Sequence, residues 1–248
     1  MQSSFKTYSH TDSVARIDEI LDSPAGNYEE RSSIPSRDSL TFTNGFYVNC
    51  TCVFMDIKGS SELPQKHQRP RLAKIYRSFI SEAVAVLNGN PLCAEANIHG
   101  DAVWGVFEGG TKPNIDSAFS LCAQLASLIA ILNCRLKKRD IDPISVGIGA
   151  DWGRALMVKA GHKGSGINEV VWMGDVVNGA ANMCKQAKSS FSDAFICVSE
   201  NIFGNLSVSN QQMFTQSGYG WHGASVVNSE MNKWWEENCK PKPMNYGW

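Results

Sequence analysis

The sequence lacks the features that mark secreted, membrane-spanning or polyanion-binding proteins. Its first twenty residues are polar and mixed in charge, and no stretch approaches the ~18 uninterrupted apolar residues of a membrane span. Positive charge is not in excess, because 23 Lys and Arg stand against 24 Asp and Glu, for a net charge of -1. We therefore expect a cytoplasmic protein that binds neither nucleic acid nor a membrane through its overall charge.

Paired cysteine motifs are also missing. The eight cysteines are scattered, with no CxxC pair and no zinc-finger spacing. We interpret them as buried free thiols in a reducing compartment. Since the 248 residues are 43% hydrophobic, one large core is expected. We predict an N-terminal arm over 1–45, a main domain over 46–240 and a C-terminal tail over 241–248.

The pattern of apolar residues predicts alternating strands and helices. A strand rich in β-branched and aromatic residues covers 46–55 and stops before Asp56, and a helix with Pro70 in its first turn covers 69–88. Strands over 94–98 and 102–107 form a hairpin that bends at Asp101.

The second half of the main domain continues this alternation. The expected elements are a helix over 116–138, strands over 144–150 and 154–160 joined by a turn at 151–153, a strand over 169–173, a helix from Asp175 and a strand over 194–199. Short helices are expected over 12–22 and 229–237. The order predicts an α+β or α/β domain with helices covering one sheet, and its opening resembles a ferredoxin-like βαββαβ unit.

Two aspartates stand where metal-binding carboxylates are expected. If the strand before Asp56 neighbours the hairpin that carries Asp101, the two side chains lie side by side. Mg²⁺ and Mn²⁺ prefer oxygen ligands and share them with phosphates, so the pair suits two-metal phosphoryl chemistry. The turn Lys58-Gly59-Ser60-Ser61 offers backbone N–H groups to a triphosphate. Either aspartate taken alone is equally typical of an ordinary turn.

Three ordered segments carry a family resemblance. VFMDIKGSSEL, IHGDAVWGVF, and VGIGADWGRALMVKAG followed by MGDVVNGAANM resemble the class III adenylate/guanylate cyclase catalytic domain over about residues 46 to 200. The resemblance implies that Asp56 and Asp101 bind two metal ions with help from the carbonyl of Ile57, and that Asn178 orients the ribose. It further implies a homodimer in which the two aspartates come from one chain and Asn178 from the other.

The sequence departs from the purine cyclases at the positions that matter for substrate choice. The family's transition-state arginine is replaced by Asn182, and the two purine-reading positions hold Asn97 and Val171. A valine cannot accept a hydrogen bond from an adenine amino group. The missing positive charge has several candidate replacements, namely Lys58, Arg69, Arg71, Arg77, Arg154 and Lys185.

With these departures, the NGFYV segment and the late SEMNKWW segment, the sequence resembles the bacterial pyrimidine cyclases of Pycsar anti-phage defence. That resemblance implies a cyclic UMP or cyclic CMP messenger made from UTP or CTP, with UTP preferred here, and a separate effector protein that the messenger activates. Tyr47 or Phe46 is our candidate for narrowing the base pocket, and Asn97 for reading the pyrimidine edge. A purine cyclase with relocated base contacts and a catalytically silent cyclase-like module are the alternatives.

Overall fold

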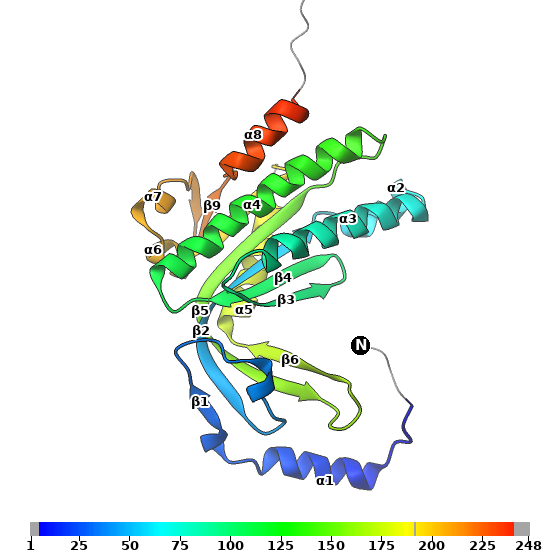
Figure 1. The fold of residues 1–248 in the computed structure, drawn as a ribbon, viewed down its shortest axis with the longest axis vertical. Coiled ribbons are helices and arrows are strands. Elements are labelled where there is room, and N and C mark those ends of the chain that lie inside the picture. The colour runs from blue at the N-terminus through cyan, green and yellow to red at the C-terminus, as the bar shows by residue number, and fades with distance from the viewer. Residues whose placement is uncertain (1–4, 191, 241–248) are drawn as a thin grey trace, which may run out of the picture.

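The fold is organised around two long strands that run through the whole molecule (Figure 1). The structure is a computed structural model that describes residues 5–190 and 192–240. In it, β2 (Gly45–Ile57) pairs antiparallel with β5 (Val146–Gly161) along the full length of β2. They lie at the centre of a sheet whose strand order is β3 (Cys93–His99), β4 (Ala102–Glu108), β2, β5, β7 (Ala194–Ser199), β9 (Trp221–Ala224) and β8 (Gln216–Gly218). At their other ends, β2 also pairs with β1 (Tyr28–Glu30) and β5 also pairs with β6 (Asn168–Met173).

The predicted βαββαβ unit is present. Its elements are β2, α3 (Arg69–Asn88), β3 (Cys93–His99), β4 (Ala102–Glu108), α4 (Lys112–Lys137) and β5. Helix α3 has the predicted bounds, with a proline in its first turn, and buries Ile75, Phe79, Ala83 and Leu87 at helical spacing. Strands β3 and β4 form the predicted antiparallel hairpin. The mixed sheet and its helices confirm the α+β class.

Helices cover both faces of the sheet. Helices α3 and α4 pack over the largest core, which includes Val53, Met55 and Ile148. Among the described residues, α4 alone is long and apolar enough to cross a membrane, but 61% of its most apolar window is buried inside the fold. The opposite face carries α5 (Asp175–Lys188).

Helix α5 packs closely against β5, and glycines make this approach possible. A Cβ atom on Gly149 would lie 1.9 Å from the backbone nitrogen of Cys184, and one on Gly179 would lie 1.9 Å from Oδ2 of Asp151. Neither position has room for a side chain. The glycines therefore fix the height of α5 above the sheet, and with it every side chain that α5 presents.

One predicted turn is absent. The segment 151–153 was expected to separate two strands, but β5 continues through it without a break. Asp151 is buried, and its Oδ1 accepts hydrogen bonds from the backbone N–H of Trp152 and from the hydroxyl of Ser199. The ladder to β2 also continues across this stretch. Buried hydrogen bonds and strand pairing thus override the turn preference of Asp and Gly.

The chain after α5 adds a smaller set of elements at one edge of the sheet. They are β7 (Ala194–Ser199), α6 (Glu200–Asn205), α7 (Val208–Gln211), β8 (Gln216–Gly218), β9 (Trp221–Ala224) and α8 (Ser229–Asn238). The predicted strand over 194–199 and the short helix over 229–237 are confirmed. The other four elements are too short to leave a periodic signal.

The N-terminal arm forms a helix and one strand. Helix α1 (His10–Leu21) is near the predicted 12–22, and β1 (Tyr28–Glu30) pairs parallel with the start of β2. The apolar residues of α1, among them Val14, Ile17 and Leu21, are at least half exposed in the single chain. The predicted tail over 241–248 lies outside the described residues.

The prediction that all cysteines are free is wrong for two of the eight. Cys134 of α4 and Cys239, just after α8, form a disulfide, with Cα atoms 5.8 Å apart and a sequence separation of 105. The other six are free, and most of them are buried as expected. Sequence spacing gave no sign of this pair, because only the packing of α8 on α4 brings the two thiols together.

We predict that reducing this disulfide destabilises the protein. Closing so long a loop restricts the unfolded chain and is worth about 2–4 kcal/mol. The melting temperature should fall by about 5–10 °C with reductant. Cys239→Ser should melt like the reduced wild type and lose its response to reductant, whereas the control Cys93→Ser should keep it. A Cys239→Ser variant as stable as the oxidised protein would contradict the prediction.

Candidate active site

The structure brings the two predicted metal-binding aspartates together. Asp56 lies near the end of β2 and pairs across the sheet with Ala102, the residue that follows Asp101. Asp101 sits in the β3–β4 turn, where Gly100 adopts φ 64°. One carboxylate oxygen of Asp101, Oδ2, is buried and has no hydrogen-bond partner among the described residues. The pair therefore presents one acceptor, Oδ2 of Asp101, that the described chain leaves unsatisfied.

The charges around Asp56 are unbalanced. Burial raises the pKa of Asp56, and the neighbouring Asp101 raises it further. Lys188 donates a hydrogen bond from Nζ to Oδ2 of Asp56 at 2.6 Å, which lowers that pKa only in part. Burial also lowers the pKa of Lys188, but the hydrogen bond and charge of Asp56 outweigh it, so the net shift is upward. Two carboxylates thus share one lysine, a state that an added cation stabilises.

Lys188 is a residue that the sequence analysis missed. It ends α5, 132 residues away from Asp56 in sequence, and it was not among the basic residues considered there. A signal was available, because Lys188 follows buried Ala180 and Cys184 at four-residue spacing and so lies on the inner stripe of the helix. A lysine in that stripe must meet a buried acid or remain unpaired.

The turn after β2 has a different arrangement from the one its sequence suggested. Lys58 turns its ammonium group away to the backbone carbonyls of Ser190 and Ser192, at 2.9 and 2.6 Å. Gly59 adopts φ 61° and leads into a short 3-10 helix over Ser60–Glu62, so Ser60 and Ser61 start a helical turn beside Asp56. The backbone N–H of Lys58 is also engaged, because it donates to the carbonyl of Ser145 at 2.8 Å.

Asn178 and Tyr47 lie far from the aspartates of their own chain. Asn178 is exposed and precedes Lys188 by ten residues of α5, which separates them by about 15 Å along the helix axis. Tyr47 precedes Asp56 by nine residues of an extended strand, or about 30 Å. The guanidinium of Arg154 lies 3.7 Å from the centre of the Tyr47 ring and also binds Glu30. Phe46, the other aromatic candidate, is buried in the core.

Asn97 lies on β3 opposite Trp104, with its side-chain Nδ2 buried and without a hydrogen-bond partner among the described residues. Two residues earlier on the same strand, Glu95 is buried and leaves Oε1 unpartnered, and Trp172 of β6 (Asn168–Met173) leaves Nε1 unpartnered. The sequence analysis singled out neither Glu95 nor Trp172, because a glutamate in a strand and a tryptophan in another carry no motif.

The acidic residues fit Mg²⁺ or Mn²⁺ as ligands shared with a substrate. Among residues 5–190 and 192–240, no three His, Cys, Asp or Glu side chains converge on one point. Mg²⁺ commonly binds one or two protein carboxylates and takes its remaining ligands from phosphates and water. Asp56 and Asp101, with one buried oxygen unsatisfied, match that donor set.

The chain is similar in sequence to uridylate cyclases. No protein-family model matches the chain. It is 36% identical to a uridylate cyclase from Gulbenkiania mobilis over 96% of this chain and 100% of that protein. It is 33% identical to a uridylate cyclase from Treponema porcinum over 92% of this chain and 80% of that protein.

Solved structures of class III cyclases have the same fold. A class III adenylyl cyclase-like ATP-binding protein from Pseudomonas aeruginosa superposes with a TM-score of 0.70 at 18% identity, covering 91% of this chain and 49% of that one. The adenylyl cyclase CyaB from P. aeruginosa superposes with a TM-score of 0.61 at 16% identity, covering 75% and 97%. The chain therefore belongs to the uridylate cyclase family and is a nucleotidyl cyclase with the class III fold.

Proposed function

We propose that the protein converts UTP to 3′,5′-cyclic UMP and pyrophosphate, with two Mg²⁺ or Mn²⁺ ions held by Asp56 and Asp101. The juxtaposition of these two carboxylates, one with an unsatisfied buried oxygen, is the observation that carries the proposal. The naming of the relatives supports UTP as the substrate. Formation of cyclic CMP from CTP is the second candidate, because the two positions that read the purine base in purine cyclases hold Asn97 and Val171 here.

The reaction requires the ribose 3′ oxygen to attack the α-phosphorus. The new O3′–P bond forms as the bond to the β-phosphate oxygen breaks, pyrophosphate leaves, and the hydroxyl proton passes to solvent. Divalent cations, when bound, neutralise the triphosphate charge and ease deprotonation of the hydroxyl. Asp56, Asp101 and the Ile57 carbonyl would hold these cations, the N–H groups of residues 59–61 would bind phosphate, and Asn178 would orient the ribose.

The distances within one chain favour a homodimer with shared sites. Asn178 and Asp56 lie near opposite ends of α5, too far apart to hold one nucleotide together. Two chains packed in opposite directions would place the Asn178 end of each α5 beside the aspartates of the other, giving two equal sites. The exposure of Asn178 in the single chain agrees with this arrangement.

In the cell, we propose that the enzyme acts in the cytoplasm and that its cyclic nucleotide is an alarm signal in anti-phage defence. A separate effector protein would bind the messenger.

The first prediction concerns the product. Purified protein incubated with Mn²⁺ and each of ATP, GTP, CTP and UTP should give cyclic UMP as its main product by mass spectrometry. Asp56→Ala and Asp101→Ala should each lower the rate at least 1000-fold, because each removes a metal ligand. Cyclic AMP or cyclic GMP as the main product would refute the pyrimidine proposal.

The second prediction concerns the shared site. Asp56→Ala and Asn178→Ala variants should each be nearly inactive alone, yet a refolded equal mixture should regain about a quarter of the wild-type rate. Half of the dimers would then be mixed, and each mixed dimer would hold one intact site of two. A mixture of Asp56→Ala with Asp101→Ala is the matched control and should stay inactive, because both changes damage the same half-site.

The third prediction concerns pH and metal. Because the folded pKa of Asp56 is raised, its contribution to stability is present at acidic pH and is lost as pH rises through the folded pKa. Without metal, Asp56→Asn should therefore melt higher than wild type at pH 7, by a margin that shrinks towards pH 4. Mn²⁺ should raise the melting temperature of wild type and of the control Asp18→Asn but not of Asp56→Asn. Equal stabilisation of all three by Mn²⁺ would argue against a metal at Asp56.

A further inference from the structure

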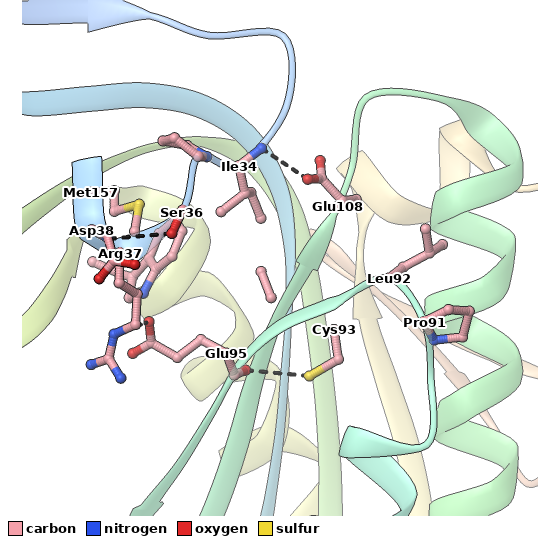
Figure 2. A pocket seen from close by; sticks show the side chains of 13 residues that line it. Ile34, Ser36, Arg37, Asp38, Pro91, Leu92, Cys93, Glu95, Glu108 and Met157 are labelled. Carbon is pink, nitrogen blue, oxygen red and sulfur yellow. Dashed lines mark hydrogen bonds and ion pairs between the residues drawn. The ribbon is translucent and has the colours of Figure 1, made fainter. Parts of the chain in front are cut away.

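A cavity of about 490 Å³ lies between the arm and the β3–β4 hairpin (Figure 2), and Asp56 is not among the residues that line it. Arm residues 34–38 form one wall and β3 with Trp172 forms another. The arm is held there because the backbone N–H of Ile34 donates to Oε1 of Glu108 at 2.9 Å. Its size is in the range of ligand-binding pockets, about 300–1,000 Å³.

Glu95 and Trp172 are two buried polar side chains on this cavity that lack partners. The Glu95 side chain is 6% exposed, and its Oε2 lies 3.9 Å from Nε of Arg37, so the two charged groups face each other in Figure 2. Its other oxygen, Oε1, has no hydrogen-bond partner among the described residues, and neither has Nε1 of Trp172, a residue only 7% exposed. Leaving a buried polar group without a hydrogen bond is unfavourable, so a ligand that supplied the partner would be stabilised here.

Asn97 is a third residue with an unpartnered polar atom, and it lies on the same face of β3 as Glu95. Alternate residues of a strand share a face, so Asn97 lies beside Glu95 on β3. Burial raises the pKa of Glu95, and the nearby Arg37, Trp172 and Asn97 lower it in part. Yet neither Nε1 of Trp172 nor Nδ2 of Asn97 makes a hydrogen bond of normal geometry within the described chain. The carboxylate of Glu95, a hydrogen-bond acceptor, is thus flanked by two donors, Nε1 of Trp172 and Nδ2 of Asn97, that make no hydrogen bond.

We propose that Glu95, Asn97 and Trp172 read the uracil ring of the substrate, with Glu95 as the residue that selects UTP over CTP. Uracil presents an acceptor, a donor and an acceptor along O4, N3–H and O2, which complements the donor, acceptor and donor of Asn97, Glu95 and Trp172. Cytosine places a lone pair on N3 against the Glu95 carboxylate and an amino group against the Asn97 donor. The inference rests on the proposed function.

The chain direction sets the orientation of the base. Trp172 precedes Asn178 by six residues, through the end of β6 and the start of α5, so it lies on the side of the ribose contact. O2 is the uracil oxygen nearer to the ribose. Trp172 therefore donates to O2 and Asn97 to O4. Of these three residues only Asn97 occupies one of the two purine-reading positions, so Glu95 and Trp172 are additional specificity-determining residues.

Product ratios test the inference directly. With equal UTP and CTP, the ratio of cyclic UMP to cyclic CMP does not depend on how much of a variant is folded. Glu95→Gln keeps the shape but offers an N–H to N3 of cytosine, so the ratio should fall about 100-fold. Glu108→Gln, the matched control, changes a carboxylate of the same cavity that is already hydrogen-bonded and should leave the ratio unchanged.

Two further variants separate the three contacts. Trp172→Phe removes a donor to O2, an atom that uracil and cytosine share, so kcat/KM should fall about tenfold for both and the ratio should hold. Asn97→Asp replaces the donor with an acceptor and should move the ratio towards cyclic CMP. If the ratio is unchanged in both Glu95→Gln and Asn97→Asp but wild type makes cyclic UMP, the inference is overturned and the proposed function still holds. Wild type that makes no cyclic pyrimidine would overturn both.

Discussion

The antiparallel pairing of β2 with β5 is the constraint on which the rest of the structure depends. It runs unbroken from Gly45 opposite Val158 to Ile57 opposite Val146. One end of this ladder carries Asp56, and the other carries Tyr47 beside Arg154 and the strand β6 that leads into α5. A one-residue slip would turn Asp56 into the core under α3 and α4 and bury its carboxylate among aliphatic side chains. Register and chemistry are therefore set by the same hydrogen bonds.

The second constraint is the contact of α5 with β5, which brings a cation to the carboxylate pair. Gly149 and Gly179 allow the helix to lie almost on the strand, and at that height Lys188 reaches Asp56. The lysine compensates only one of two acids, and burial amplifies the imbalance. The fold thus holds two carboxylates together against their repulsion, a state that is favourable only when further positive charge arrives.

The sequence predicted what periodicity and spacing can encode. Helix α3, the hairpin around Asp101 and the neighbouring positions of Asp56 and Asp101 followed from apolar patterns and turn residues. Three things did not follow. The turn expected at Asp151 was overridden by buried hydrogen bonds, the Cys134–Cys239 bond depends on helix packing, and Lys188 meets Asp56 only through the tertiary fold. Glu95 and Trp172 escaped notice for the same reason, since an unsatisfied atom is visible only in three dimensions.

Helix α5 has a consequence for how such an enzyme is switched. Its first turn carries the exposed Asn178, its last residue, Lys188, binds Asp56, and the helix of fourteen residues joins the two. In the homodimer that we propose, each α5 would connect the two active sites. A small rotation of one subunit against the other would then change the geometry of both centres at once.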